Sequence, residues 1–224
     1  MSRLIAIGDV HGCDFALETL LNEIQPTTRD TLVFLGDYVD RGPNSNRVLD
    51  ILVDLITHCR VIPLIGNHEI MVFKGWRGVT TFDFWMMHGG RETLASYGGD
   101  PRNVPQDHMT FLSHCLRHHE TERHIFLHAC YDPFVSLDEQ PDQILFWRHI
   151  FDDVPPPFEN GKTVVVGHTP QQDGTIRNLG HILMIDTNCY GNGWLTAVDV
   201  NSDFVWQANN LGKTQTSYIP AIGV

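Results

Sequence analysis

The feature that most constrains the fold is a unit that occurs three times in the first third of the chain. Each unit has a short apolar run, a loop of glycines and polar residues, and then a helix-like segment. The apolar runs cover residues 4–7, 31–35 and 61–65. A helix is predicted over 13–24, where Leu17, Leu20, Leu21 and Ile24 fall on one face. This alternation predicts an α/β sheet whose polar loops gather at one end.

The rest of the chain is less regular. Residues 75–123, rich in aromatic side chains and glycine pairs, are predicted as a largely helical insertion beside the open end of the sheet, with a helix over 109–124. This insertion is either a substrate-facing cap or structural filler. Strands are expected at 124–127 and 163–166, and a helix at 142–150. Short apolar runs at 181–185, 194–200 and 204–207 are typical of an antiparallel meander.

Composition limits the classes of protein that fit. The 224 residues, 42% of them hydrophobic and 19% charged, suit a single domain over 1–224. A net charge of −12 argues against nucleic acid as a partner. No apolar run reaches membrane-spanning length, and the N-terminus turns polar too soon for a signal peptide. Five cysteines without C-x-x-C spacing favour reduced thiols in a cytoplasmic protein, and the oligomeric state is left open.

Carboxylate, amide and imidazole side chains follow the apolar runs, at the edge of the sheet where α/β proteins bind ligands. They are Asp9, His11, Asp37, Asp40, Asn67, His68, His128 and His168. Carboxylate, amide and imidazole groups without cysteine suit a borderline divalent metal such as Mn²⁺, Fe²⁺ or Zn²⁺. One group could provide Asp9, His11 and Asp37, and another Asn67, His128 and His168. If Asp37 bridged two ions, they would share a water and acidify it.

Five blocks occur in an order that resembles the metallophosphoesterase pattern. They are Gly8-Asp9-x-His11-Gly12, Gly36-Asp37-Tyr38-Val39-Asp40-Arg41-Gly42, Gly66-Asn67-His68-Glu69, His128-Ala129 and Gly167-His168-Thr169. More narrowly, the chain resembles the serine/threonine protein phosphatases of the PPP type, in their compact bacterial and phage form. The resemblance implies a β-sandwich flanked by helices.

The resemblance also implies roles for individual residues. Asp9, His11 and Asp37 would hold one metal ion, and Asp37, Asn67, His128 and His168 a second, with manganese expected and iron or zinc as alternatives. His68 would be the general acid, kept protonated by Asp40, although Asp40 could instead cap a turn. Arg41 and Arg148 would bind phosphate oxygens, although Arg148 could instead be an exposed helical arginine.

The sequence departs from the family pattern at two places. Cys130 stands where the family has glycine after the His128 block, which leaves the shape of the pocket there in doubt. Asn188 replaces another common glycine, and asparagine tolerates the left-handed conformation.

The resemblance leads to a hypothesis of function with two rivals. The main hypothesis is a phosphomonoesterase that removes phosphate from phosphoserine or phosphothreonine in proteins, through in-line attack by hydroxide bound to two metals. The first rival is a dinucleoside polyphosphate hydrolase, for example of diadenosine tetraphosphate. The second is a non-catalytic module that binds phosphoproteins. Asp40 and Glu69 favour the phosphatase over the first rival, by resemblance only.

Overall fold

The computed structural model describes residues 2–76, 79–151 and 153–223, and these form two β-sheets. The six-stranded sheet has the order β11-β10-β9-β1-β2-β3. Its strands are β1 (Leu4–Ile7), β2 (Thr31–Phe34), β3 (Arg60–Pro63), β9 (Leu195–Asp199), β10 (Phe204–Ala208) and β11 (Thr214–Tyr218). The five-stranded sheet has the order β4-β5-β6-β8-β7. Its strands are β4 (His118–Glu120), β5 (His124–Leu127), β6 (Thr163–Val166), β7 (Arg177–Asn178) and β8 (Ile182–Met184).

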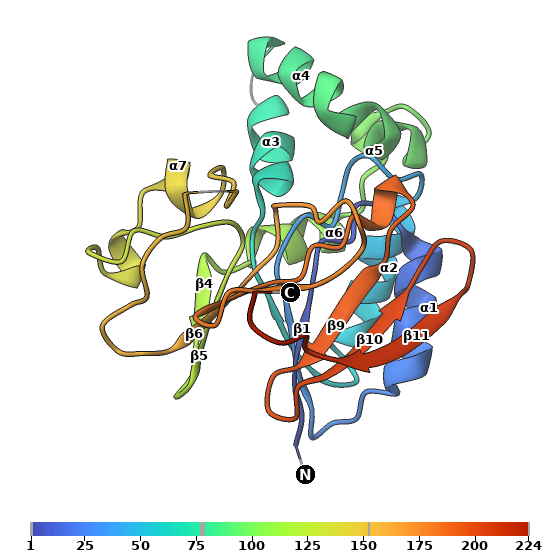
Figure 1. Ribbon diagram of the computed structural model, residues 1–224. Coiled ribbons are helices and arrows are strands. Elements are labelled where there is room, and N and C mark those ends of the chain that lie inside the picture. Colours follow the sequence, from blue (N-terminus) through green and yellow to red (C-terminus); the bar gives the residue numbers. More distant parts are fainter. Residues whose placement is uncertain (1, 77–78, 152, 224) are drawn as a thin grey trace.

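The two sheets pack face to face, as the predicted β-sandwich requires. Val33 and Leu35 of the β2 segment lie in one buried apolar cluster with Phe126 and Val165 of the other sheet. Helices α1 (Asp14–Ile24) and α2 (Ser45–Leu55) cover the outer face of the six-stranded sheet (Figure 1). The segment that contains α7 (Asp142–Leu145) covers the other sheet. Helices therefore flank the sandwich.

The insertion is largely helical, as predicted, and α3, α4 and α5 stand at the end of the molecule opposite the N-terminus (Figure 1). Its helical elements are α4 (Val79–Trp85), a kinked segment (Met86–Gly90), α5 (Arg91–Ser96), a 3₁₀ turn (Pro101–Asn103) and α6 (Gln106–Ser113), and α3 (Asn67–Gly75) leads into it. Further 3₁₀ turns cover Leu137–Glu139 and Cys189–Gly191. Among the described residues, no helix combines the length and apolarity needed to cross a bilayer.

The helix predicted over 109–124 was wrong in its second half. The helix α6 ends at Ser113, and His118–Glu120 instead pairs antiparallel with β5. The apolar spacing of Phe111, Leu112 and Cys115 continues past the helix end, so periodicity overestimated its length. Pairing with β5 satisfies the backbone hydrogen-bonding groups of this segment. The spacing of apolar residues cannot reveal such a long-range pairing.

Three smaller differences concern the second half of the chain. The helix expected over 142–150 is only the four residues of α7. The run at 181–185 does not join the predicted meander, because β8 pairs in parallel with β6 in the other sheet. The meander consists of β9, β10 and β11, and the last of these strands was not predicted.

Candidate active site

The predicted metal-ligating side chains converge at the carboxyl ends of strands from both sheets. Asp9 and His11 follow β1, Asp37 follows β2, and Asn67 opens α3 immediately after the β3 segment. His128 follows β5, and His168 follows β6. All six side chains are buried. Convergence of the two sheets at one edge brings residues far apart in sequence into one cluster.

The backbone of these loops is unusual. His11, Asp37, Asp40, Arg41 and His168 all have positive φ angles, between 46° and 70°. Such conformations are uncommon outside glycine, and they concentrate at functional sites. Gly66 is also required, because a Cβ there would lie 2.1 Å from Asp37 Oδ1. The chain therefore accepts local strain to hold these side chains together.

One group of ligand atoms, all within 4.8 Å of one another, comes from His11, Asp37 and His68. His11 Nδ1 is 3.0 Å from the Val39 carbonyl oxygen, which therefore accepts its N–H, so the lone pair of the neutral ring is on Nε2. His11 Nε2 lies 3.4 Å from Asp37 Oδ2. Asp9 belongs neither to this group nor to the second group of ligand atoms found among the described residues. Its carboxylate accepts the backbone N–H of His168.

The second group contains Asp37, His128 and His168. His128 Nδ1 donates to the Leu35 carbonyl over 2.8 Å, so its Nε2 carries the free lone pair. Asn67 Oδ1 lies 2.9 Å from His128 Nε2 and 3.0 Å from His168 Nδ1. Asp37 belongs to both groups, which is the position expected of a bridging ligand.

The electrostatics of this cluster fit bound cations. Burial lowers the pKa of His11 and of His128, and it lowers the pKa of His168 to about 3, so these imidazoles are neutral. Burial raises the pKa of Asp9, and the nearby charges of Asp186 and Asp37 raise it further. Neutral imidazoles beside crowded buried carboxylates, with oxygen and nitrogen donors only, suit divalent metal ions.

Asp186 belongs to this carboxylate cluster, although it was not predicted as a site residue. It is buried, and burial raises its pKa to about 7, with Asp37 adding to the increase. In the sequence it is marked only by its place two residues before Asn188. The neighbouring Asn188 adopts the left-handed conformation that its replacement of glycine predicted.

His68 and Asp40 form a buried pair, with Nδ1 of the histidine 2.8 Å from Oδ2 of the carboxylate. Burial disfavours the imidazolium, but the charges of Asp37 and Asp40 and the hydrogen bond to Asp40 outweigh it, so the pKa of His68 is raised. His68 Nε2 is buried, and among the described residues it has no hydrogen-bond partner. The pair can therefore hold a proton on Nε2, facing the metal-ligating groups.

The insertion supplies two further contacts to Asp40 that sequence reasoning missed. The Trp85 indole N–H lies 2.9 and 3.0 Å from the two Asp40 oxygens. The Thr93 hydroxyl donates to Asp40 Oδ1 over 2.6 Å. Both side chains are buried. The insertion was expected to be a substrate-facing cap or structural filler. These contacts give it a different role, because it holds the Asp40 carboxylate that is hydrogen-bonded to His68.

The two predicted phosphate-binding arginines are placed differently. Arg41 Nη1 lies 3.2 Å from His11 Nε2, at the edge of the cluster. Arg148 instead pairs with Asp153 and lies beyond the end of α7, so it is not a helical arginine. The next residue, His149, stacks on His168 with ring centroids 4.3 Å apart. The segment around Arg148 therefore touches the site through His149, which was not predicted.

Glu69 connects two of the site loops. Its carboxylate accepts the backbone N–H groups of Asp37, Tyr38 and Gly66 over 2.8–2.9 Å. Burial and, to a smaller extent, the charge of Asp37 raise the pKa of Glu69 to about 7, although these amide donors favour its ionised form. Cys130, by contrast, packs in the apolar cluster outside the five-stranded sheet.

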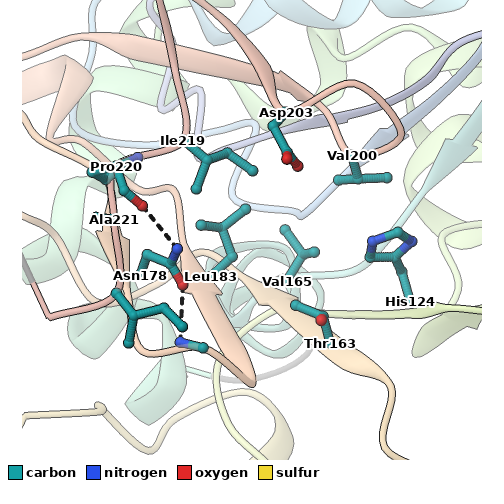
Figure 2. A pocket seen from close by; sticks show the side chains of 12 residues that line it. His124, Thr163, Val165, Asn178, Leu183, Val200, Asp203, Ile219, Pro220 and Ala221 are labelled. Atoms are coloured by element: carbon teal, nitrogen blue, oxygen red, sulfur yellow. Dashed lines mark hydrogen bonds between the residues drawn. The ribbon is translucent and has the colours of Figure 1, made fainter.

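A separate cavity of about 310 Å³ lies near the amino ends of β5 and β6 (Figure 2). His124 and Thr163 line it, and residues 219–222 form another part of its wall. Asn178 donates to the Pro220 carbonyl and accepts the backbone N–H of Gly180, as the dashed lines show. None of the predicted site residues lines this cavity.

Two sheets flanked by helices, with a cluster of carboxylates and imidazoles at their shared edge, define a metal-dependent phosphoesterase. Residues 2–176 match the calcineurin-like phosphoesterase family, and the chain belongs to that family. It is a hydrolase of this superfamily, whose members use a two-metal site. The two groups of ligand atoms that share Asp37 agree with such a site.

Several relatives carry names of one activity. The chain is 26% identical to a protein named bis(5′-nucleosyl)-tetraphosphatase PrpE [asymmetrical] from Oceanobacillus iheyensis, over 87% of both chains. It is 25% identical to a protein of the same name from Bacillus cereus, over 86% of this chain and 88% of the relative. A symmetrical bis(5′-nucleosyl)-tetraphosphatase from Delftia acidovorans is 40% identical, but over only 34% of this chain and 27% of the relative.

Solved structures share the fold at lower sequence identity. A cold-active protein-tyrosine phosphatase from a Shewanella species has a TM-score of 0.69 at 17% identity, over 96% of this chain and 80% of that chain. A serine/threonine phosphatase from Saccharomyces cerevisiae has a TM-score of 0.63 at 16% identity, over 100% of this chain and 81% of that chain. These likenesses show the fold alone.

Proposed function

We propose that this chain hydrolyses dinucleoside polyphosphates, with diadenosine tetraphosphate as the test substrate. The observation that carries the proposal is the match over nearly the whole length to relatives named bis(5′-nucleosyl)-tetraphosphatases. This was the first rival in the sequence analysis, and the relatives favour it over the protein phosphatase. Because the relatives matched over most of their length are named asymmetrical, the expected products are ATP and AMP.

The chain's own residues have distinct tasks in this reaction. Asp9, His11, Asp37, Asn67, His128 and His168 would hold two divalent ions, with manganese the predicted metal. When bound, such ions supply positive charge to the phosphoryl oxygens and make water more acidic. Arg41 binds a phosphoryl oxygen, because its guanidinium lies at the edge of the cluster. Charge that develops on the phosphoryl group is then stabilised by groups already in place.

His68 supplies a proton where the leaving oxygen needs one. Asp40 accepts its Nδ1–H, which leaves Nε2 to carry a proton toward the substrate. A polyphosphate leaving group is a weak base, so cleavage of an anhydride depends little on this proton. An alkoxide leaving group is a strong base and depends on it heavily.

The protein phosphatase is a second candidate because of this pair. A fully buried Asp40–His68 pair, with two further donors on the carboxylate, suits the release of a serine or threonine alkoxide. Arg148, the other predicted phosphate ligand, would have to leave Asp153 to contribute. The non-catalytic binding module has no comparable observation in its favour.

The experiment compares the two substrates on the same Mn²⁺-loaded protein. Initial rates are measured with diadenosine tetraphosphate and with phosphoserine and phosphothreonine peptides, and the nucleotide products are separated by chromatography. We expect kcat/KM for the dinucleotide to exceed that for the best peptide by at least about tenfold. A higher value for a peptide would overturn the proposal. The Asp37→Asn variant is the control for contaminating hydrolases, because it removes the shared ligand.

A further inference from the structure

A groove of about 680 Å³ opens beside the candidate active site, a size within the usual range for small-molecule sites. Arg41 lies in its wall and also contacts His11, so the groove begins where the metal-ligating groups end. Tyr190 forms another part of the wall, and its ring packs edge-on against His11, with centroids 5.1 Å apart. The groove is therefore continuous with the place where phosphate would react.

The groove combines aromatic, apolar and cationic surface. The Arg41 guanidinium carbon lies 4.6 Å from the centre of the Tyr190 ring. Met86 and Met87 supply apolar surface, and 71% of the Met87 side chain is exposed. Arg91 lines the groove and is exposed, and within the described residues it forms no ion pair. Exposed methionine beside tyrosine is adaptable surface that can pack against a flat ring.

Charge favours a polyanion in this groove. Two arginines, Arg41 and Arg91, line the groove together with one acidic residue, Glu92. The groove therefore has an excess of basic residues, although the formal net charge of the whole protein is −12. Arg41 lies beside the metal-ligating His11, and Arg91 in the same groove extends the phosphate-binding surface away from the site of cleavage. A tyrosine and two methionines at the same place suit a nucleobase joined to that phosphate chain.

The wall of the groove is held in a fixed position relative to Arg41. The Gly89 carbonyl accepts the Arg41 N–H over 3.3 Å, and a Cβ on Gly89 would lie 2.5 Å from that nitrogen. Gly89 has φ 109°, outside the helical range, and it lies at a kink within the segment Met86–Gly90, where a residue without a Cβ is favoured. The methionines before it are thus carried by a segment that is bonded directly to the phosphate-binding loop.

We infer that this groove receives one nucleoside of the substrate, with the base against Tyr190 and Met87 and the adjoining phosphates on Arg41 and Arg91. The inference rests on the function proposed above and names the part of the site that recognises the nucleotide. An apolar side chain next to a phosphorylated residue in a peptide is the competing occupant. These two occupants can be distinguished by a binding measurement without peptide, because only the nucleoside assignment predicts that a free nucleotide binds in the groove.

The test measures nucleoside binding separately from catalysis. Calorimetry compares adenosine 5′-(α,β-methylene)diphosphate, which resists hydrolysis between its phosphorus atoms, with methylenediphosphonate, which lacks the nucleoside. The Mn²⁺-loaded protein should bind the nucleotide roughly tenfold more tightly, the scale of one stacked base. Met87→Asp should remove most of that preference. Leu211→Asp is the matched control, because Leu211 is a similarly exposed apolar residue (78%) outside the groove.

Kinetics on the same variants separates this inference from the proposed function. Met87→Asp and Arg91→Ala should each raise KM for diadenosine tetraphosphate roughly tenfold, with a smaller change for p-nitrophenyl phosphate.

If the wild type hydrolyses the dinucleotide but neither variant changes KM or the nucleotide preference, the groove assignment fails and the function stands. If the nucleotide preference is present and sensitive to Met87→Asp but no dinucleotide is hydrolysed, the function fails and the groove assignment stands. Equal binding of the two diphosphates by the wild type overturns the assignment.

Discussion

The contact between Trp85 and Asp40 allows a sharp test of how the insertion acts on the site. Trp85→Phe keeps an aromatic ring in the buried position but removes the N–H that lies 2.9 and 3.0 Å from the Asp40 oxygens. Thr93 and His68 still contact the carboxylate, so it keeps two of its three side-chain partners. The variant therefore changes how Asp40 is held without removing the His68–Asp40 pair.

The size of the effect follows from the lost hydrogen bond. A hydrogen bond to a charged group contributes ~1.5–3 kcal/mol, and each 1.36 kcal/mol corresponds to about a factor of ten. If that energy keeps Asp40 oriented toward His68, kcat/KM for an alkyl phosphate should fall between about tenfold and about a hundredfold. An aryl phosphate such as p-nitrophenyl phosphate has a weakly basic leaving group, so its kcat/KM should fall much less.

Trp76 provides a matched control for the loss of ring volume. Its ring packs perpendicular to that of Trp85, with centroids 6.1 Å apart, and its N–H has no hydrogen-bond partner in the described chain. Trp76→Phe should therefore leave the ratio of alkyl to aryl rates unchanged. The reasoning is refuted if Trp85→Phe lowers both rates equally, or if Trp76→Phe changes the ratio as much.

Three further predictions follow from contacts of single carboxylates. Asp40→Asn should slow an alkyl phosphate much more than an aryl phosphate, and equal losses in kcat/KM would argue against His68 as the acid. Asp37→Ala should abolish binding of at least one of two Mn²⁺ ions, counted by elemental analysis; a wild type that binds one ion contradicts the shared ligand. Asp30→Asn should lower the free energy of unfolding by ~2 kcal/mol in urea titration at pH 7, because Asp30 is buried and accepts hydrogen bonds from Arg3 and Thr27. Arg3 holds the pKa of Asp30 well below its usual range. This stabilisation is therefore fully present above the unfolded-state pKa of ~3.9 and is lost as the pH falls below it. If the wild type and the variant differ as much in free energy of unfolding at pH 2 as at pH 7, the prediction is wrong.

The cluster of metal-ligating residues could be predicted from the sequence, because side chains that follow parallel strands gather at the carboxyl end of a sheet. Each apolar run ends in a loop, and the parallel strands β1, β2 and β3 bring Asp9, Asp37 and Asn67 to one edge of their sheet, where His128 joins them from the other sheet. The sandwich followed from the same motifs through family resemblance. Their roles as ligands stay predictions, because the structure shows their positions and not bound ions.

The supporting residues could not be predicted because no periodic pattern marks them. Trp85 and Thr93 contact Asp40 across 45 and 53 positions of sequence. An aromatic residue in a helix-like stretch is usually part of the core, and only the folded structure reveals that the Trp85 N–H faces a carboxylate. Asp186 and His149 were missed for the same reason, since each becomes informative only through its neighbours in space.

Two contacts of one short segment connect the recognition of substrate with the chemistry. Trp85 ends α4 and donates to Asp40, while Gly89, four residues later, accepts the N–H of Arg41. Met86 and Met87 lie between them in the groove wall. Because Asp40 and Arg41 are consecutive, a shift of this segment moves the support of the proposed acid, the phosphate-binding arginine and the groove together. Substitutions in 85–90 are therefore expected to change kcat and KM jointly, whereas substitutions at the metal-ligating positions act first on metal binding.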